Sequence, residues 1–313
     1  MKGLEIAKRF YEEHGAPMLA EQFSELLPLI AVGLVGSGSE CFGFDDEISR
    51  DHDFEPGFLI FLPGEDVVDR KTAFSLERAY AKLPKEFLGL SRGGLAPVGG
   101  IRHGVVRAAD FFLEKTGSAD GVLPLSAWLT IPEQALAEAT NGEIFRDDGD
   151  LVTSIRERLL AMPEDVRRKR LAGHLLLMGQ AGQYNYRRCL AHGEGGAAQL
   201  ACFEFVRSAV SAVFLLNRRY APYYKWSFRA LRALPELSVL AETFEYLLVT
   251  GNGEDHAEDK AFLLEEVASA VIEALQAQGL TKATCGDLEK HAYSVNDSIA
   301  DPEIRNLHIL AAV

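Results

Sequence analysis

The distribution of apolar residues differs between the two halves of the chain. In the first half, short apolar runs at residues 29–35, 58–62 and 105–109 have the length and the Ile, Val, Leu and Phe content of strands. Residues 3–25 and 66–88 show the spacing of amphipathic helices, the first of them interrupted at Gly15-Ala16-Pro17. The first half is therefore predicted to mix helices and strands.

The second half shows helical periodicity only, and no strand is predicted in it. The expected helices cover residues 156–160, 163–186, 197–217, 226–234, 237–249, 257–278, 287–299 and 302–310. Residues 200–216 are apolar almost all round, as expected of a central helix in a bundle. The polar, turn-prone stretch at 143–150 marks a boundary, so we predict domains at 1–145 and 146–313. The fold class is α+β, a small mixed-sheet domain followed by an all-α bundle.

Composition and charge narrow the class of protein. The chain has 313 residues and a net charge of −14, which argues against broad non-specific binding of nucleic acid. Its four cysteines show no metal-ligand spacing and are interpreted as reduced thiols. The N-terminal residues lack the apolar core of a signal peptide, and the apolar run Leu26–Val35 is too short to span a bilayer. We therefore expect a cytoplasmic protein without membrane contact. The acidic run Asp45-Asp46-Glu47 is interpreted as a solvated loop.

Candidate chemistry concentrates in residues 32–53. The first predicted strand leads into Gly36-Ser37-Gly38-Ser39, and Asp51 and Asp53 follow. If Asp51 and Asp53 lie on a strand, their two carboxylates share one face of it. They then repel each other unless a cation lies between them. A glycine turn that exposes backbone N–H groups suits phosphate oxygens. The pattern is neither a P-loop nor a hydrolase elbow, because no Gly-Lys-Ser/Thr and no Gly-x-Ser-x-Gly is present there. It predicts a site where metal ions meet a triphosphate.

The spacing of this pattern resembles the signature of the nucleotidyltransferase superfamily related to DNA polymerase β. The signature is an apolar strand, Gly-Ser, about ten residues, and Asp-x-Asp; here Gly38-Ser39 precedes Asp51-x-Asp53 by eleven residues. The resemblance implies that Gly38 and Ser39 contact the triphosphate of a nucleotide, and that Asp51 and Asp53 hold two Mg²⁺ ions. Gly36-Ser37 could supply the turn instead, so the register stays open by two residues.

The whole chain also resembles an uncharacterised family of bacterial nucleotidyltransferase-like proteins, known by a domain of unknown function. The segments that carry the resemblance are GSGSE…SRDHD, WLTIPEQALAEATNGEIF (128–145), GQAGQYNYRRCLAHGE (179–194), LLNRRYAPYYKW (215–226) and RNLHI (305–309). The resemblance implies a helical half like that of kanamycin-type nucleotidyltransferases. It does not name a substrate.

Two features depart from the superfamily pattern. Phe54-Glu55-Pro56-Gly57 interrupts the strand that usually continues after Asp-x-Asp, and a proline removes a ladder hydrogen bond. Many members also carry a third carboxylate on a later strand, where it acts as a base on the acceptor hydroxyl. Asp110 is the candidate for this role. The alternative is that Asp110 is the N-cap of a helix at 111–115.

Two basic and aromatic clusters lie in the helical half. In Asn217–Trp226, Lys225 is a candidate triphosphate contact, and Tyr220 or Tyr224 a candidate base contact. The alternative is a helix end packed by aromatic rings, with its cations facing the helix dipole. Arg187, in the weaker cluster Tyr184–Arg188, is a candidate nucleotide contact or part of an exposed helix face.

Together these features predict a Mg²⁺-dependent nucleotidyltransferase. It would transfer a nucleoside monophosphate, with ATP the favoured donor, to a hydroxyl of an acceptor that is a small molecule, a tRNA or a protein. The alternative is a non-catalytic module on the same fold. Such a module would bind nucleotide as a regulator or bind a protein partner, as an antitoxin does.

Overall fold

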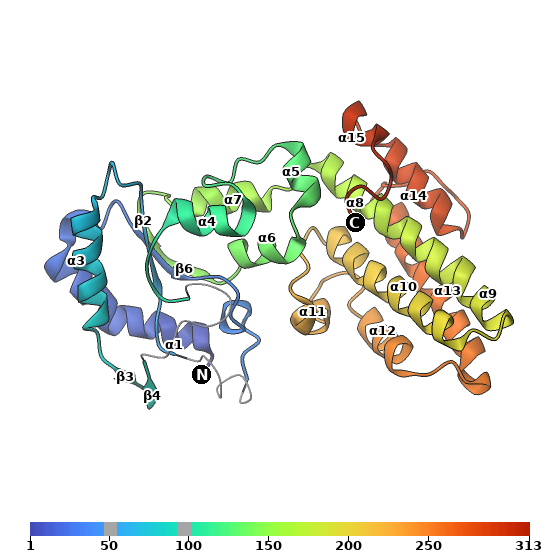
Figure 1. Cartoon of the computed structure of the whole chain (residues 1–313), viewed down its shortest axis with the longest axis horizontal. Helices are drawn as coiled ribbons and strands as arrows, with labels where there is room; N and C mark the ends of the chain where they lie inside the picture. The colour runs from blue at the N-terminus through green and yellow to red at the C-terminus, as the bar shows by residue number, and fades with distance from the viewer. Residues whose placement is uncertain (47–54, 93–101) are drawn as a thin grey trace. The chain divides into compact units, whose positions relative to one another are not determined.

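The computed structural model describes residues 1–46, 55–92 and 102–313, with backbone alone at 254 and 255. The chain forms two compact units. The first comprises residues 1–123 and 134–161 and holds a mixed sheet with helices; the second comprises 124–133 and 162–313 and is largely helical (Figure 1). The α+β class is confirmed. Compared with the predicted boundary at 145, the first unit runs on to residue 161, and residues 124–133 join the second.

The sheet of the first unit has the strand order β5-β2-β1-β6. The strands are β1 (Ala31–Leu34), β2 (Leu59–Leu62), β5 (Gly104–Arg107) and β6 (Glu143–Asp147). β1 pairs antiparallel with β2 and β6, whereas β2 and β5 run parallel. Every residue of β1 and β2 is buried, as their continuous apolar sequences predict. The three predicted strands are thus present.

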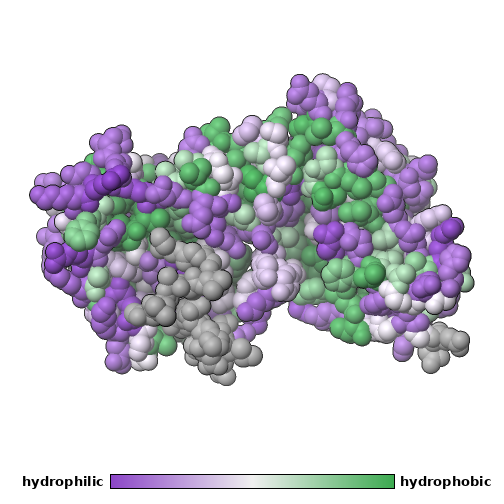
Figure 2. Space-filling view, viewed as in Figure 1, coloured by the Kyte–Doolittle hydropathy of each residue, from purple (hydrophilic) through white to green (hydrophobic). Residues whose placement is uncertain are grey.

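Other elements of the first unit are helical within the described residues, apart from the short pair β3 (Glu86–Phe87) and β4 (Leu90–Ser91). They are α1 (Gly3–Phe10), the π-helical turn η1 (Tyr11–Gly15), α2 (Ala16–Gln22), the 3₁₀ turns η2 (Ser24–Leu26) and η3 (Glu40–Phe42), α3 (Arg70–Ala81), α4 (Ala108–Thr116), α6 (Glu133–Thr140) and α7 (Thr153–Leu160). Hydrophilic side chains predominate over α3 on the face drawn in Figure 2, as expected of an amphipathic surface helix.

The Gly15-Ala16-Pro17 segment does not break the first helix. α1 continues through η1 into α2, so one helical path covers residues 3–22. A Cβ atom at Gly15 would lie 2.4 Å from the ring of Phe58. The predicted interruption is therefore wrong. The glycine allows an aromatic ring to approach the helix, and the π-helical turn carries the chain past it.

The entry into β2 is fixed by the hydroxyl of Tyr80 on α3. This hydroxyl donates to the Phe58 carbonyl at 2.9 Å and accepts from the Phe58 N–H at 3.1 Å. Pro56 and Gly57 are buried and precede β2, so the proline removes no hydrogen bond from the ladder. A Cβ at Gly57 would lie 2.6 Å from the ring of His103. The segment before β2 is thus packed against the unit, and β2 begins only at Leu59; Asp51 and Asp53, which precede the predicted interruption, lie outside the described residues.

Strand β6 is not predicted from the hydrophobic pattern. Its five residues are half-buried at the edge of the sheet, and three of them are charged. Its last residue, Asp147, accepts hydrogen bonds from the N–H groups of Leu151, Val152 and Thr153 at 2.7–2.9 Å. The polar stretch predicted as a domain boundary is therefore an edge strand followed by a capped helix start, because edge strands need no continuous apolar run.

The second unit contains the helices expected from the sequence and one that was not predicted, α5. They are α5 (Leu125–Thr130), α8 (Glu164–Met178), the π-helical η5 (Gly179–Tyr186), α9 (Arg187–Ala191), α10 (Gly195–Leu216), α11 (Tyr224–Leu231), α12 (Leu240–Val249), α13 (Glu254–Ala277), α14 (Leu288–Asp297) and α15 (Pro302–Asn306). Among the described residues, α10 is the one helix long and apolar enough to span a membrane. Of its most apolar window 61% is buried inside the protein, as in the central helix of a bundle.

A buried ion pair joins α5 to the rest of the second unit. Arg170 of α8 donates from Nη2 to the carbonyls of Trp128 and Ile131, at 2.8 and 2.6 Å. Its Nη1 lies 3.6 Å from Oε1 of Glu133, whose Oε2 accepts from the Ala221 N–H at 3.0 Å. Burial raises the pKa of the Glu133 carboxyl, and the Arg170 charge opposes that rise. These contacts explain why residues 124–133 belong to the helical unit.

Candidate functional site

The chain turns sharply after β1, at the first Gly-Ser dipeptide. Gly36 has a φ of +123°, which glycine alone adopts readily. The side-chain amide of Asn141 holds this turn from both sides. Its Oδ1 accepts from the Gly36 N–H at 2.9 Å, and its Nδ2 donates to the Gly36 carbonyl at 2.7 Å. The path of the chain into Ser37 is therefore set by a residue 105 positions later.

Asn141 and Gly142 form a part of the site that the sequence analysis missed. Gly142 has a φ of +63°, and a Cβ there would lie 1.9 Å from the carbonyl oxygen of Leu34. Its N–H donates to the Cys41 carbonyl at 2.8 Å. An Asn-Gly dipeptide signals a tight turn. Nothing in the sequence connects that signal to a turn more than 100 residues earlier.

The second Gly-Ser dipeptide leads into a 3₁₀ turn. Ser39 precedes η3, and its carbonyl accepts from the N–H groups of Phe42 and Phe44 at 3.2 and 2.9 Å. The Gly38 carbonyl accepts from the Cys41 N–H at 3.1 Å. Of the two registers that the sequence leaves open, the structure places Gly36-Ser37 on the wall of a cavity, whereas Gly38 and Ser39 are not among its lining residues.

This cavity of the first unit has a volume of about 260 Å³. The end of β1, strand β5 and helices α3 and α4 supply its walls. Asp110, the predicted base, lines the same cavity as Gly36 and Ser37. The structure thus brings together three of the predicted site residues, which come from segments more than 70 positions apart.

Asp110 lies in the first turn of α4, which begins at Ala108 after Arg107. The alternative prediction, Asp110 as an N-cap, is therefore wrong, because the helix starts before it. Asp110 also lies beyond the end of β5 and not on the strand itself. Its side chain is exposed, and a carboxylate in the first turn is stabilised by the helix dipole. Asp110 can therefore contact a ligand in the cavity.

Charges of both signs line the cavity. They are carried by Glu77, Arg102, Arg107, Asp110, Glu114 and Lys115. The Arg107 Nη1 donates to the Pro63 carbonyl at 2.6 Å, and the Lys115 Nζ lies 2.7 Å from the Glu138 carboxylate. The cations suit phosphate oxygens, and the carboxylates suit a divalent metal ion.

Two acidic residues behind the turn are buried. Burial raises the pKa of the Glu40 carboxyl, although the charge of Arg102 opposes the rise. Asp45 is 2% exposed, and its Oδ2 accepts from the Gly3 N–H at 2.9 Å, at the start of α1. The prediction of a solvated acidic loop is therefore wrong for Asp45, which ties the loop after η3 to the first helix.

Asp51 and Asp53, the predicted metal ligands, lie outside the described residues. Within residues 1–46, 55–92 and 102–313, no group of three or more His, Cys, Asp or Glu side chains is placed to hold a metal ion. The metal site therefore stays a prediction that rests on the Asp-x-Asp pattern.

The three predicted contacts near α11 differ in exposure. Tyr220 is half-buried, and burial, followed by the charge of Glu133, raises the pKa of its hydroxyl. Tyr224 is 75% exposed, and its ring centroid lies 4.3 Å from that of Tyr223. The Lys225 Nζ lies 4.9 Å from the centroid of the Trp226 ring. Aromatic and cationic side chains are therefore exposed at the start of α11, whereas Tyr220 is half-buried.

Arg187 does not join this surface. It lies just before the N-terminal end of α10 and pairs with Glu258 at 2.8 Å, whereas Tyr220 follows the C-terminal end of α10 (Figure 1). α10 has 22 residues and is therefore about 33 Å long. One nucleotide cannot contact both ends.

Comparison with family models finds a match to part of the chain. Residues 128–227 match the model described as Domain of unknown function (DUF4037). This agrees with the predicted resemblance to a family known by a domain of unknown function. The DUF4037 match includes Arg187, Tyr220, Tyr224 and Lys225 but neither the β1 turn nor Asp110.

Two further comparisons were made. No curated protein matches the chain. Among solved structures, a nucleotidyltransferase-like protein from Exiguobacterium sibiricum 255-15 is similar over 91% of this chain and 80% of its own, with 13% identity and a TM-score of 0.37.

Proposed function

We propose that this protein is a Mg²⁺-dependent nucleotidyltransferase. It transfers a nucleoside monophosphate from a nucleoside triphosphate, with ATP the favoured donor, to a hydroxyl of an acceptor. The observation that carries the proposal is the cavity shared by the Gly36-Ser37 turn and Asp110. A glycine turn followed by Asp-x-Asp supports it from the sequence.

The triphosphate would lie against the Gly36-Ser37 turn. The peptide groups of this turn are held in place by Asn141 before any ligand arrives, so little reorganisation is needed on binding. Arg107 and Lys115 bring positive charge to the same cavity. Cations placed around phosphate oxygens are what a phosphoryl-type displacement requires, because most of its catalysis is positioning and charge neutralisation.

Carboxylates fit Mg²⁺, a hard cation that prefers oxygen ligands. Asp51 and Asp53 would hold the metal, and Asp110, Glu77 and Glu114 supply further carboxylate oxygen atoms on the cavity wall. When bound, Mg²⁺ would neutralise phosphate charge and lower the pKa of the acceptor hydroxyl.

Asp110 would act as the general base. The acceptor oxygen forms a bond to the α-phosphorus while the bond from that phosphorus to the bridging oxygen of the β-phosphate breaks. Pyrophosphate leaves with that electron pair, and the acceptor proton passes to the Asp110 carboxylate. The exposed position of Asp110 lets an acceptor reach it.

In the second unit, the predicted nucleotide contacts lie at the start of α11. Tyr224 can stack on a base, and Lys225 can pair with a phosphate, because both lie on the first turn of α11. Tyr220, the alternative base contact, is half-buried. Arg187 is left out, because it lies near the other end of α10. The acceptor is a small molecule, a tRNA or a protein hydroxyl, and the net charge of −14 favours a small cationic or protein acceptor over bulky RNA.

The test is nucleotide binding and turnover with Mg²⁺ and each α-labelled triphosphate. Asp51→Asn with Asp53→Asn is expected to lower turnover about 10³-fold by removing the metal, and Asp110→Asn by about 10²-fold by removing the base. Glu21→Gln is the matched control, since it removes an exposed carboxylate of the same unit that does not line the cavity. It should leave turnover unchanged.

Binding and turnover separate the competing functions. Tight, metal-dependent binding without pyrophosphate release would favour a nucleotide-sensing regulator. The nucleotide site itself is wrong if no triphosphate binds, or if the double Asp51/Asp53 variant binds metal-nucleotide as well as the wild type.

A further inference from the structure

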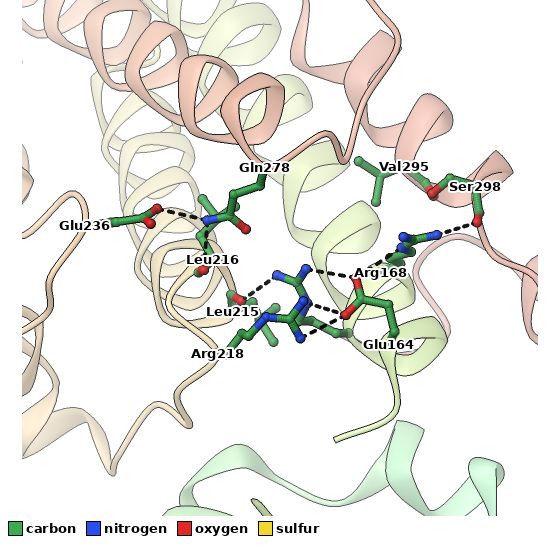
Figure 3. A network of polar contacts seen from close by, with 10 residues as sticks. Glu164, Arg168, Leu215, Leu216, Arg218, Glu236, Gln278, Val295 and Ser298 are labelled. Carbon is green, nitrogen blue, oxygen red and sulfur yellow. Dashed lines mark hydrogen bonds and ion pairs between the residues drawn. The ribbon is translucent and has the colours of Figure 1, made fainter. Parts of the chain in front are cut away.

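Three arginines of the second unit converge on one carboxylate. Glu164, at the start of α8, accepts from Arg167 at 2.9 and 3.1 Å and from Arg168 at 3.2 Å, and it lies 3.0 Å from Nη1 of Arg218. Figure 3 shows the guanidinium groups directed at this carboxylate. The arginine charges hold the pKa of the Glu164 carboxyl below its usual value, although burial alone would raise it. One negative charge therefore faces three positive ones.

Arg218 has an unusual backbone conformation for its residue type. Its φ is +52°, at the position after the C-cap residue Asn217 of α10, where glycine is usual. The hydrogen bonds of a Schellman motif are present, from the Arg218 N–H to the Leu215 carbonyl at 3.1 Å and from the Arg219 N–H to the Phe214 carbonyl at 3.0 Å. A side chain here costs free energy that glycine would avoid. Such a cost points to a role for the side chain.

The arginine side chain is not required to cap α10. Arg167 Nη1 donates to the Leu215 carbonyl at 3.0 Å, and Gln278 Nε2 donates to the Leu216 carbonyl at 3.0 Å (Figure 3). The side chain of Arg218 is 63% exposed, and its contact with Glu164 is made through Nη1. Among the contacts of the described residues, its Nε and Nη2 groups are not used by the protein.

The arginines open onto a cavity of about 680 Å³. Leu216, Pro235 and Leu280 give it apolar surface, and Asn217 and Gln278 give it amide groups. The other carboxylate on its wall, Glu236, accepts from Gln278 Nε2 at 2.9 Å, at a separate point from Glu164. The cavity is thus large enough for an organic molecule, with positive charge gathered on one wall.

We propose that this cavity binds a small organic molecule through an oxyanion, a phosphate or a carboxylate group, held beside Glu164 by Arg168 and Arg218. The planar fork of arginine matches both oxyanions with paired hydrogen bonds. One arginine suffices to neutralise Glu164, so the further guanidiniums repel one another until a second anion enters. This site is separate from the cavity at Gly36 and does not depend on the proposed transferase function.

The test measures anion binding by calorimetry and by the thermal midpoint, with phosphate, pyrophosphate and malonate as probes and with chloride at equal ionic strength as the reference. Arg218→Gln should weaken binding about tenfold or more, since it removes a charge-assisted hydrogen-bond donor. Arg218→Lys should restore part of that loss, because it keeps the charge without the fork. Arg207→Gln is the matched control, because it also removes an exposed, ion-paired arginine, on α10.

Glu164→Gln makes the sharper test. It removes the competing carboxylate, so the affinity for the oxyanion probes should rise about tenfold relative to the wild type. A network that only stabilises the fold predicts no such gain. If Glu164→Gln does not fold, the proposal is tested by comparing the oxyanion affinities of Arg218→Gln and Arg207→Gln.

The probes distinguish the two oxyanions. Binding of phosphate or pyrophosphate above malonate identifies a phosphorylated ligand, and the reverse identifies a carboxylate; either result supports the site. The proposal is overturned if no probe binds better than chloride, or if Arg207→Gln weakens binding as much as Arg218→Gln.

Discussion

Gly36 in the first unit and Arg218 in the second both have a positive φ, but they are different kinds of residue. At Gly36 the backbone itself makes the contacts, because Asn141 holds both of its peptide groups and the turn forms a cavity wall. At Arg218 the backbone could be glycine without loss, and the side chain is the part that contacts Glu164. A left-handed glycine therefore indicates a backbone requirement, whereas a left-handed arginine indicates a side-chain requirement.

The two sites should consequently respond to substitution in different ways. The β1 turn depends on close contacts between backbone atoms, so small added volumes should destabilise the first unit. The arginine cluster depends on charge at a partly exposed surface, so substitutions there should change ligand binding more than stability.

The largest effect is expected for Gly142→Ala. The new Cβ would lie 1.9 Å from the Leu34 carbonyl oxygen, at a backbone φ of +63°, and we expect a loss of about 3 kcal/mol in the free energy of unfolding of the first unit. Gly43→Ala is the matched control, because its φ of +68° is similar and its Cβ meets no atom within 4 Å. It should cost about 1 kcal/mol. Equal losses in urea denaturation would contradict the role of close packing at Gly142.

Acid should destabilise the second unit through His174. Burial, followed by the charge of Arg170, lowers the pKa of this imidazole to about 3. The unfolded chain, with an ordinary histidine pKa near 6.5, binds the proton first as the pH falls. Stability is therefore complete above pH 6.5 and decreases toward pH 3, by about 2 kcal/mol at pH 5. His174→Leu should remove this part of the decrease, as measured by urea denaturation at pH 5 and pH 7.

Asn141→Ala tests the anchor of the β1 turn. It removes two hydrogen bonds to Gly36, and the first unit should lose between about 1 and 2 kcal/mol. Asn141→Asp keeps the acceptor for the Gly36 N–H but places an oxygen opposite the Gly36 carbonyl, so it should not restore stability. Nucleotide binding should weaken in both variants. If it stays unchanged, the turn does not hold a phosphate.

The strands β1 and β2 could be predicted because they are buried on both faces and their sequences are continuously apolar. β6 could not, since an edge strand with the sequence Glu-Ile-Phe-Arg-Asp carries no such run. The helices of the second unit were predictable from periodicity and from Gly, Pro and Asn at their ends.

The candidate sites were predictable only in part. The two Gly-Ser dipeptides are chemically alike, and the contact that distinguishes them comes from Asn141, far along the chain. Arg187, in the separate cluster Tyr184–Arg188, was also predicted as a nucleotide contact, but the length of α10 separates it from Tyr220. Glu164, Arg167 and Arg168 follow helical spacing, yet the third arginine of the cluster comes from the turn after α10. Pairings across long sequence distances depend on tertiary packing and are not encoded in local patterns.

The smallest change in stability, and the most direct test of the comparison, is expected for Arg218→Gly. Glycine relieves the backbone cost of a positive φ, about 1 kcal/mol, while an exposed ion pair of about 0 to 1 kcal/mol is lost. The free energy of unfolding should therefore stay within about 0.5 kcal/mol of the wild type, while oxyanion affinity falls as far as in Arg218→Gln. The mirror change, Gly36→Ala, should destabilise the first unit although no atom lies within 4 Å of the added Cβ. Should Arg218→Gly instead lose as much stability as Gly36→Ala, the arginine is a structural ion-pair partner, and the distinction between the two turns fails.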